Sequence, residues 1–597
     1  MCGIAGILNR QPEAHGAALQ AMQAALRHRG PDDRGLWSSS CGLAQFAHTR
    51  LAILDLSPGG HQPMVCAQSA LTIVFNGEIF NFRELRAELE QSGVTFRTHS
   101  DTEVLLRLYE KEGAAMLPKL RGMFAFAIWS QKANTCFMAR DPFGIKPLYY
   151  TVTGGSMLFA SELKALQASG HVSRQLDLAA LTAYFQSGSV AEPATLLADV
   201  RCLEAGHSLT WQDGRITTAS HWQVDFGPSA TSRQTAAADH VQSTRDALLD
   251  SVRAHFVSDV PVGVFLSGGI DSTALVALSR LTGAQDLRTF SIALDDAALD
   301  ESSIAARTAA HFGTQHHELR LDAAQGRRMF GSFLESFDQP TIDGLNTFTV
   351  SSFAREQGMK VVLSGLGGDE LFAGYPSFTK VPQIARLARG LGPLRGVAGD
   401  VLQRFTSRVP FQRLGGYFEQ QPTLRGAYGA FRGVFPKIQA RRMAAFVAGI
   451  TETELPRSLA DETDPAQPTV ADQVSELELT LYMRNQLLKD SDVMSMAHAL
   501  ELRVPFVDRR LFDTLARVPA AVRLQQGKKL LLAAVPEIPD WVSSQPKRGF
   551  LFPFQQWLAA PEWRDDFAQA TRNTPVPLQS WYQKWSLFML KRWLERR

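Results

Sequence analysis

Residues 264–275 read VFLSGGIDSTAL, a short stretch with two adjacent glycines at its centre. Its first residues are an apolar run typical of a buried strand, and the residues after the glycines have the apolar spacing of a helix. Backbone N–H groups in such a glycine-rich turn, together with the start of a helix, form a seat for phosphate. The stretch lacks the GK[ST] ending of the common phosphate loop. A plain strand–turn–helix corner is the alternative interpretation.

The same strand–loop–helix order recurs on the C-terminal side of this stretch. RTFSIAL (288–294) and KVVLSGLGGDELFAGY (360–375) each contain a short apolar strand, and the second continues into another glycine-rich loop. Alternation of this kind predicts a parallel sheet with helices on its faces. Beyond residue 377 we expect the chain to be helical to its end.

The N-terminal third is predicted to be mainly β-structure. Apolar runs bounded by turn residues predict strands at 71–75, 122–130 and 134–141. Apolar spacing near 3.6 residues predicts helices at 14–27, 82–92 and 101–112. A polar stretch at 223–237 is typical of a linker. We therefore predict one domain over 2–214, a linker over 215–237 and a second domain over 238–597.

Composition excludes several classes of protein. The 597 residues are too many for a single hydrophobic core. The formal net charge of +2 gives no indication of nucleic-acid binding, and the longest apolar runs have the length of strands, so we expect no membrane segment. Five cysteines without a CxxC pair predict a reducing, cytoplasmic setting, and a cysteine directly after Met1 leaves no room for a signal peptide.

The chain begins MCGIAG, so removal of the initiator methionine would make Cys2 the first residue. Its thiol and a free α-amine would then belong to one residue, and such an amine can act as the base for its own nucleophile. The alternative is that Cys2 is a small apolar residue in a buried strand.

Four further polar residues of this region lie near strand ends. Arg50 follows one predicted strand, Asn76 and Glu78 flank a glycine at the end of another, and Asp101 precedes a helix. Taken singly, the arginine fits a surface ion pair, the Asn-Gly pair a turn, and the aspartate a helix N-cap.

Together, six motifs in this order resemble the glutamine amidotransferase domain of the N-terminal-nucleophile class: MCGIAG, RHRGPDD, RLAI, FNGEI, SDTEV and RDPFGIKPLYY. The resemblance implies an αββα Ntn-hydrolase fold in which Cys2 attacks the side-chain amide of glutamine, giving a thioester and ammonia. It also implies an oxyanion hole formed by Asn76 and Gly77. Arg50 would hold the α-carboxylate of glutamine as a bidentate fork, and Asp101, with Glu78 nearby, would hold its α-ammonium. The implied glutamine-binding residues are Arg50, Leu51, Ala52, Ile53, Leu54, Asn76, Gly77, Glu78 and Asp101.

SGGIDS resembles the pyrophosphatase-type loop (PP-loop) of AMP-forming ligases. With TFSIAL, LSGLGGDELFAGY, DVMSMAHALELRVPFVD (492–508), GKKLLL (527–532) and PKRGFLFP (546–553), the chain resembles glutamine-dependent asparagine synthetase over nearly its whole length. The implied second domain is a parallel-sheet, adenine-nucleotide α hydrolase-like α/β fold with a helical C-terminal region. The implied ATP-binding residues are Leu266, Ser267, Gly268, Gly269, Asp271, Ser272, Ile292, Ser364 and Gly365.

The resemblance also implies a group of charged side chains around the phosphates of ATP. Asp271 and Asp369 are the candidate Mg²⁺ ligands, and Lys529 is the candidate for the pyrophosphate and the transition-state charge. Its neighbour Lys528 remains an alternative for that role. Without the surrounding match, Lys529 would be interpreted as a solvated lysine on a helix.

The implied reaction joins the two halves: ATP·Mg²⁺ adenylates a carboxylate, and ammonia derived from glutamine attacks the acyl-adenylate. The implied products are an amide, AMP and pyrophosphate. An internal passage for ammonia makes physical sense, since ammonia is mostly ammonium in water at neutral pH. We expect glutamine, ATP and a carboxylate, with aspartate as the leading acceptor, as the substrates. A homodimer is left open.

The chain departs from the family pattern at two places. The second signature commonly reads SG[E/D]G, whereas this chain has Leu366, which can neither accept a proton nor pair with an ammonium. Val493 stands where an arginine is frequent. Either another carboxylate, Asp343 or Asp369, handles the intermediate, or the acceptor is a different carboxylate such as a sugar uronate, a peptide or a secondary metabolite. A non-catalytic homologue would have lost Cys2, Arg50 or SGGIDS, and all three are present.

Overall fold

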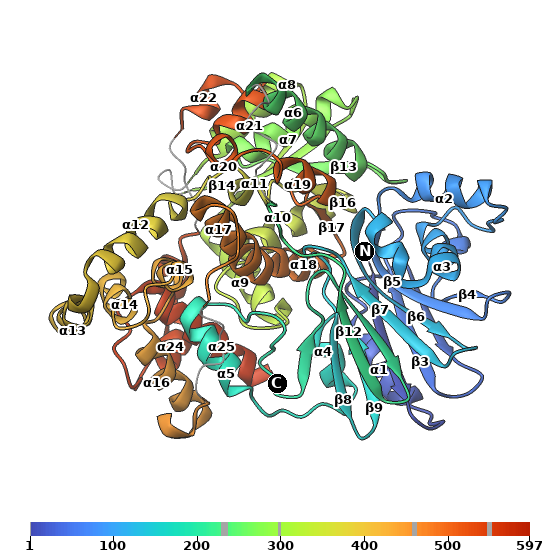
Figure 1. Ribbon diagram of the computed structural model, residues 1–597, viewed down its shortest axis with the longest axis horizontal. Coiled ribbons are helices and arrows are strands. Elements are labelled where there is room, and N and C mark those ends of the chain that lie inside the picture. The colour runs from blue at the N-terminus through green and yellow to red at the C-terminus, as the bar shows by residue number, and fades with distance from the viewer. Residues whose placement is uncertain (1, 228–236, 296–299, 457–462, 546–551, 597) are drawn as a thin grey trace.

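The computed structural model describes residues 2–227, 237–295, 300–456, 463–545 and 552–596. Figure 1 shows a strand-rich N-terminal domain on one side of the molecule and a larger domain with many helices on the other. The PKRGFLFP motif lies outside the described residues, apart from its last two positions.

Two six-stranded antiparallel sheets form the N-terminal domain, with strand orders β10-β8-β9-β1-β3-β2 and β12-β11-β7-β6-β5-β4. The strands of the first sheet are β1 (Gly3–Asn9), β2 (Asp33–Ser38), β3 (Ala44–Arg50), β8 (Tyr149–Thr153), β9 (Ser156–Ala160) and β10 (Val200–Cys202). Those of the second are β4 (Met64–Cys66), β5 (Leu71–Ile79), β6 (Gly122–Ser130), β7 (Thr135–Arg140), β11 (His207–Gln212) and β12 (Arg215–Ser220).

The side chains of β1 show how the layers stack. Because side chains alternate along a strand, Ile4 and Leu8 pack into the core between the sheets, whereas Ala5 and Ile7 pack under helices on the outer face. The outer helices of the first sheet include α1 (Gly16–Ala25) and α4 (Leu163–Ala168); α2 (Phe82–Gln91) and α3 (Asp101–Glu112) cover the second. The predicted αββα fold is confirmed.

The strand β12 differs from the sequence prediction, which assigned 215–220 to a linker. Asp213 and Gly214 both have positive φ, 50° and 80°, as in the tight two-residue turn that joins hairpin strands. This turn sends Arg215–Ser220 back along β11, where the segment pairs in register from Gln212↔Arg215 to His207↔Ser220. Its residues are mostly exposed, so no apolar alternation marks it as a strand.

The second domain contains a five-stranded parallel sheet in the order β15-β14-β13-β16-β17, which confirms the predicted parallel sheet. Its strands are β13 (Val262–Phe265), β14 (Arg288–Leu294), β15 (Gln315–Leu321), β16 (Val361–Leu363) and β17 (Glu501–Arg503). The helix α6 (Ala237–His255) precedes the first of these strands, and the helices between β13 and β16 are α7 (Ile270–Leu281), α8 (Ser302–Phe312), α9 (Ala323–Ser336) and α10 (Leu345–Glu356). The chain runs outward from β13 to β15 and then places β16 on the other side of β13. Ligands bind at such a switch point, beyond the carboxyl ends of the two central strands.

The C-terminal region is helical, as predicted, but β17 interrupts it. Its helices include α11 (Gly368–Leu371), α12 (Ser377–Gly390), α13 (Arg395–Phe405), α14 (Val409–Phe418), α15 (Leu424–Arg432), α16 (Lys437–Ala448), α17 (Val470–Leu477), α18 (Lys489–Met496), α19 (Arg509–Leu515), α20 (Ala520–Arg523), α21 (Lys529–Ala534), α22 (Asp540–Ser543), α23 (Phe554–Leu558), α24 (Pro561–Ala570) and α25 (Trp581–Arg596). A π-helical segment, Glu478–Leu488, leads into α18. The strand β17 is only three residues long and carries two charged side chains, so its residue pattern does not predict a buried strand.

Candidate active sites

Cys2 lies at the start of β1 and is buried. Its backbone nitrogen, which becomes the α-amine when Met1 is removed, donates a hydrogen bond to Asn76 Oδ1 at 3.0 Å. Burial raises the pKa of the Cys2 thiol, while the positive chain terminus, the backbone N–H of Leu51 and the charge of Arg50 act in the opposite direction. Burial has the largest effect, and the negative charge of Glu78 adds to it, so the surroundings of the resting thiol favour its protonated form. A thiol kept protonated needs a base to become a nucleophile, and the α-amine of the same residue is the candidate for that base.

Asn76 lies on β5 beside Cys2 and is fully buried. Its Nδ2 group has no hydrogen-bond partner among the described residues, although burying such a donor costs about 1–3 kcal/mol. Gly77 has φ +153°, and a Cβ there would lie 2.1 Å from the carbonyl oxygen of Met123. An unpartnered amide next to a buried thiol is a donor available to an oxyanion that forms on a substrate carbonyl.

Arg50 ends β3, and its guanidinium is held by the loop that follows. It donates to the carbonyl oxygens of Asp55 at 2.5 Å and Ser57 at 3.1 Å, and also to that of Leu54. A Cβ on Gly60 would lie 1.8 Å from Arg50 Nη2, so the loop needs glycine at this position. The loop residues Leu51, Ile53 and Leu54 are buried, and the N–H of Ala52 donates to Asp32 Oδ2.

Two buried carboxylates, Asp101 and Glu78, complete the set predicted for the glutamine site. Asp101 begins α3, and its Oδ2 accepts from the N–H of Ile79 at 3.0 Å. Burial raises the pKa of Asp101 to about 6. Burial and the nearby charges of Glu501 and Asp101 raise the pKa of Glu78 well above its usual value. This side of the site is thus acidic, as suits a substrate ammonium group.

Sequence reasoning assigned no role to two charged residues of β17, although both lie within a quoted motif. Arg503 Nη2 lies 3.8 Å from Glu78 Oε2, and Arg503 Nε donates to Glu501 Oε1 at 2.6 Å. Arg503 also donates to the backbone carbonyls of His255 and Val257. A strand of the second domain therefore forms one wall of the site around Glu78.

A buried ion network joins the domains behind Cys2. Arg29 Nε donates to the carbonyl oxygen of Cys2 at 3.0 Å, and its two terminal nitrogens contact Glu162 at 2.6 Å and Asp492 at 2.8 Å. Asp492, on α18, also pairs with Lys146 at 3.2 Å. The pKa of Arg29 is raised because its two carboxylate partners outweigh the effect of burial, so its guanidinium stays charged. Through this arginine, the backbone of Cys2 is linked to Asp492 of the second domain.

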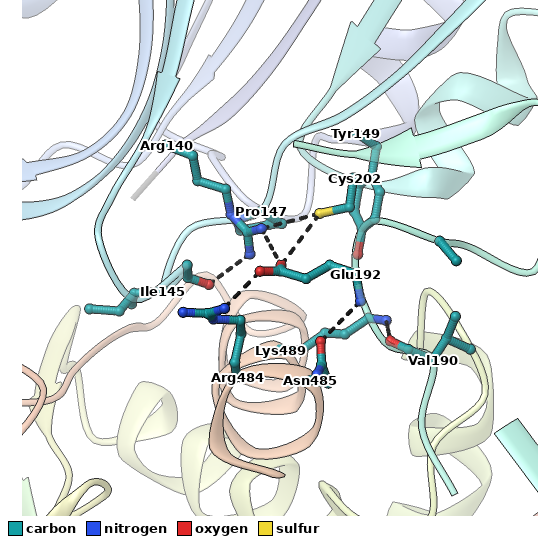
Figure 2. Close-up of a pocket in the computed structure, with 12 residues that line it drawn as sticks. Arg140, Ile145, Pro147, Tyr149, Val190, Glu192, Cys202, Arg484, Asn485 and Lys489 are labelled. Atoms are coloured by element: carbon teal, nitrogen blue, oxygen red, sulfur yellow. Dashed lines mark hydrogen bonds and ion pairs between the residues drawn. The ribbon is translucent and has the colours of Figure 1, made fainter. Parts of the chain in front are cut away.

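A polar cavity also lies between the domains and is lined by residues of both (Figure 2). Arg140 and Arg484 reach Glu192 from opposite sides, at 2.5 Å and 3.5 Å, and Arg140 also contacts the sulfur of Cys202 at 3.2 Å. Lys489 donates to a backbone carbonyl of the first domain. None of these side chains belongs to the predicted catalytic sets.

The second candidate site lies beyond the carboxyl ends of β13 and β16. The loop after β13 is closed by Ser272, whose Oγ accepts from the N–H of Ser267 at 3.2 Å and lies 3.1 Å from Ser267 Oγ. Gly268 has φ +76°, and Gly269 precedes the first turn of α7, where a Cβ would meet only Ser267 Oγ, at 3.5 Å. Amide groups of this turn and of the helix start can therefore be approached closely by phosphate oxygens.

The loop after β16 packs directly on the first loop. A Cβ on Gly368 would lie 2.4 Å from Asp271 Oδ1, and one on Gly365 would lie 2.9 Å from Asp271 Cβ. The N–H of Ser364 donates to the carbonyl oxygen of Arg503 at 2.8 Å. Leu266 and Ile292 are buried. The two signature loops thus form one crevice at the switch point.

Lys528, and not Lys529, reaches this crevice. Lys528 Nζ forms ion pairs with Asp271 and, at 2.6 Å, with Asp369 Oδ1. Burial opposes its charge, but the two carboxylates outweigh burial and raise the pKa of Lys528. Lys529, the residue named by the sequence prediction, is exposed at the first position of α21. Lys528 has φ +56°, and this left-handed turn before the helix directs consecutive side chains to different sides.

Leu366 is half-buried and packs against the apolar core of the second domain. The nearest acidic neighbour in its loop beyond Asp369 is Glu370, which accepts a hydrogen bond from Tyr375 Oη at 3.0 Å. Burial, followed by the charges of Asp369 and Glu478, raises the pKa of Glu370 to about 8. Asp343 is half-exposed, and burial raises its pKa as well.

Oxygen ligands in the crevice fit magnesium in its usual role beside a polyphosphate. Asp271 and Asp369 converge from the two loops, and Mg²⁺ is commonly held by one or two carboxylates together with substrate phosphates. Among the described residues, no group of three or more His, Cys, Asp or Glu side chains could hold a metal by itself. The donor set therefore suits a metal that arrives with the nucleotide.

Comparison with known proteins agrees with this division into two sites. The family model for the glutamine amidotransferase domain matches residues 1–222, and that for asparagine synthase matches residues 243–592. The chain belongs to the asparagine synthase family. As a member of it, the chain is a glutamine-dependent amide-forming ligase with ATP as a substrate.

Relatives with similar sequences match the chain over nearly its whole length. "Asparagine synthetase [glutamine-hydrolyzing] 1" of Bacillus subtilis (strain 168) is 34% identical over 94% of this chain and 88% of its own length. "Amidase chry2" of Gibberella zeae is 26% identical over 94% of this chain and 90% of its own length. The solved "Structure of the allosteric regulatory enzyme of purine biosynthesis" covers 53% of this chain and 80% of its own, with 18% identity and a TM-score of 0.30.

Proposed function

We propose that this family member uses Cys2 to release ammonia from glutamine and uses the loop crevice to activate a carboxylate as its acyl-adenylate. Glutamine and water give glutamate and ammonia through a thioester on Cys2. ATP and the acceptor carboxylate give the acyl-adenylate and pyrophosphate. Ammonia then displaces AMP to form the amide, and aspartate, giving asparagine, is the leading acceptor.

The observation that carries the proposal is the shared strand β17. It pairs with β16, whose loop forms the crevice, and its Arg503 contacts Glu78 in the glutamine site. The loop crevice therefore lies beyond the carboxyl end of β17, and the glutamine site lies beside its side chains. This arrangement supports transfer of ammonia within the protein, where it stays unprotonated out of contact with bulk water.

At the glutamine site, Asn76 Nδ2 supplies the oxyanion donor and its Oδ1 orients the α-amine of Cys2. Asp101 and Glu78 hold the ammonium group of glutamine. Arg50 holds the carboxylate, for which its fork exchanges part of its present bonds to the loop carbonyls. Each role is a proposal that rests on the geometry of these contacts.

At the crevice, Ser267, Gly268, Gly269 and Ser272 receive the departing pyrophosphate. Lys528 neutralises charge on the phosphates, and Asp271 and Asp369 hold Mg²⁺, which supplies further charge neutralisation when bound with ATP. We transfer to Lys528 the role expected of Lys529, because only the former contacts both carboxylates. Leu266, Ile292, Ser364 and Gly365 remain the proposed adenosine-side residues.

For the acceptor carboxylate, Leu366 favours a second candidate. A leucine that packs on the apolar core offers no charge to a substrate ammonium, and Asp369 is already engaged by Lys528. Glu370 and Asp343 are then the acidic groups left for a proton or for the amino group of aspartate. The second candidate function is the same chemistry on a uronate, peptide or secondary-metabolite carboxylate, and similarity to a protein named an amidase accords with it.

Exchange of radiolabelled pyrophosphate into ATP tests the acceptor directly, because only an acceptor that is adenylated supports exchange. The assay uses the Cys2→Ala variant, so that the result concerns the crevice alone, with aspartate, uronates and carboxyl-bearing peptides as acceptors. Exchange with aspartate supports asparagine formation. Exchange with another carboxylate alone supports the second candidate, and exchange with none of a broad panel contradicts adenylation at this crevice.

A further inference from the structure

The helix α13 and Leu394, the residue directly before it, carry a line of large apolar side chains on the outer surface. Leu394, Val397, Val401 and Phe405 are 67%, 65%, 48% and 83% exposed. Positions three or four residues apart lie on one face of a helix, so the four side chains form a continuous row, here called the α13 stripe. Single exposed apolar residues are ordinary, but a row of them marks a surface that contacts something apolar.

The opposite face of α13 packs against α14. Gly399 is buried against α14, where a Cβ would lie 2.7 Å from the carbonyl oxygen of Gly415. This close backbone approach determines which face of the helix points inward, and therefore leaves the stripe outside. Figure 1 shows α13 at an extremity of the molecule, on the far side from the glutaminase domain.

The surroundings of the stripe are strongly basic. Residues 380–419 contain two acidic residues, Asp400 and Glu419, of which Glu419 accepts a hydrogen bond from Gln403 of α13. Against these stand seven basic residues: Lys380, Arg386, Arg389, Arg395, Arg404, Arg408 and Arg413. The whole chain has 61 basic and 59 acidic residues, so the excess is local to this region. At about 100° of rotation per residue, Arg395 and Arg404 flank the stripe on its two sides. Arg404 pairs with Asp400 at 2.6 Å, whereas Arg395 and Arg408 form no ion pair with a described residue.

We propose that the α13 stripe docks on the surface of an anionic lipid bilayer. The four apolar side chains enter the boundary between headgroups and acyl chains, and the flanking arginines bind the lipid phosphates. A helix with an apolar row bordered by basic residues is the type that lies in a membrane interface. In the parts of the chain that the structure describes, no helix has the length and apolar character to span a bilayer, so the contact is peripheral.

Charge and shape favour lipid over two other occupants. A second copy docked through the same face would bring two strongly basic surfaces together, which opposes association. A nucleic acid would satisfy the arginines but would leave Phe405 and the valines in water. Binding through α13 would place the protein at a membrane surface whichever carboxylate it amidates. It departs from the sequence-based expectation of no membrane contact.

Sedimentation of the full chain with lipid vesicles tests the proposal. Vesicles of phosphatidylcholine alone are compared with vesicles that contain equal parts of phosphatidylglycerol and phosphatidylcholine. The protein is expected to sediment with the anionic vesicles, and high salt is expected to weaken this binding. The variants Val397→Ser/Val401→Ser/Phe405→Ser and Arg395→Glu/Arg408→Glu should each lower the vesicle partition coefficient at least tenfold.

A matched control removes apolar residues of comparable exposure from the glutaminase domain, through Leu36→Ser, Val65→Ser and Val152→Ser. This control should bind vesicles like the parent chain, and ammonia-dependent amide synthesis should stay within twofold in all variants. Absence of vesicle binding, equal binding to neutral vesicles, or equal loss in the control overturns the proposal. If the stripe variant instead dissociates a dimer in sedimentation velocity without changing vesicle binding, the stripe belongs to a second copy.

Discussion

Replacement of Asn76 tests the glutaminase half of the proposed mechanism most directly. Asn76 makes two separable contributions: its Oδ1 accepts from the backbone nitrogen of Cys2 at 3.0 Å, and its Nδ2 is a buried donor without a partner among the described residues. Asn76→Ala removes both contributions. Asn76→Asp keeps the acceptor for the α-amine and replaces the donor with a group that repels an oxyanion.

The expected magnitude follows from these contacts. One oxyanion-hole donor is worth about 3 kcal/mol of barrier, which corresponds to a fall in kcat of about 10²–10³. A hydrogen bond that orients the amine contributes about 1 kcal/mol more. Glutamine hydrolysis by Asn76→Ala should therefore fall by about 10³-fold. Asn76→Asp should fall at least as far, because the retained acceptor does not compensate for the lost donor.

Two assays on each variant separate the sites: glutamate release from glutamine, and AMP formation with an ammonium salt as the nitrogen source. The ammonia-dependent reaction should stay within threefold of the parent chain, because Asn76 contacts the Cys2 site and not the loop crevice. The reasoning is refuted if Asn76→Asp retains glutaminase activity within tenfold of the parent. It is also refuted if both reactions fall together in a folded variant.

Three further predictions follow from the same contacts. Lys528→Met should lower the rate of pyrophosphate exchange at least 100-fold while glutamine hydrolysis persists, whereas Lys529→Met should change the exchange rate less than threefold. The reversed pattern would assign the role to Lys529. Burial raises the pKa of Asp101 to about 6, so the ionised carboxylate that holds the ammonium group of glutamine is lost as the pH falls through 6. The kcat/KM for glutamine should therefore fall about tenfold for each pH unit below that value. The same inflection persisting in Asp101→Asn would assign it to another group. Asp492→Ala removes the carboxylate shared by the buried cations Arg29 and Lys146 and should lower the free energy of unfolding, measured by urea titration, by about 3–5 kcal/mol. The surface control Asp400→Ala should lower it by less than about 1 kcal/mol.

Local periodicity predicted much of the secondary structure. The helices expected at 82–92 and 101–112 are α2 and α3, and the strand expected at 122–130 is β6 over the same residues. The helix α2 shows helical spacing because it buries one face, whereas β6 is a continuous apolar run because it is buried on both faces. The strand β12 lacked such a pattern, and only its Asp213–Gly214 turn could have revealed it.

The site was predictable where a motif is contiguous and was not where charges converge from distant segments. The glycine-rich loop at 267–272 could be located because strand, turn and helix follow one another along the chain. The choice between Lys528 and Lys529 could not, since it depends on a left-handed residue and on two aspartates contributed by other loops.

The sequence alone indicated a β-rich first region followed by a parallel-sheet second region, and it singled out Cys2 as the candidate nucleophile, because these predictions rest on patterns within short stretches of chain. Only the tertiary structure decided that Arg503 meets Glu78, that Arg29 links Cys2 to Asp492, and that the α13 stripe remains uncovered. The physical reason is that propensity and periodicity act over one or two turns of chain. Pairing between charges hundreds of residues apart, and the exposure of a helix face, depend on how all the layers pack.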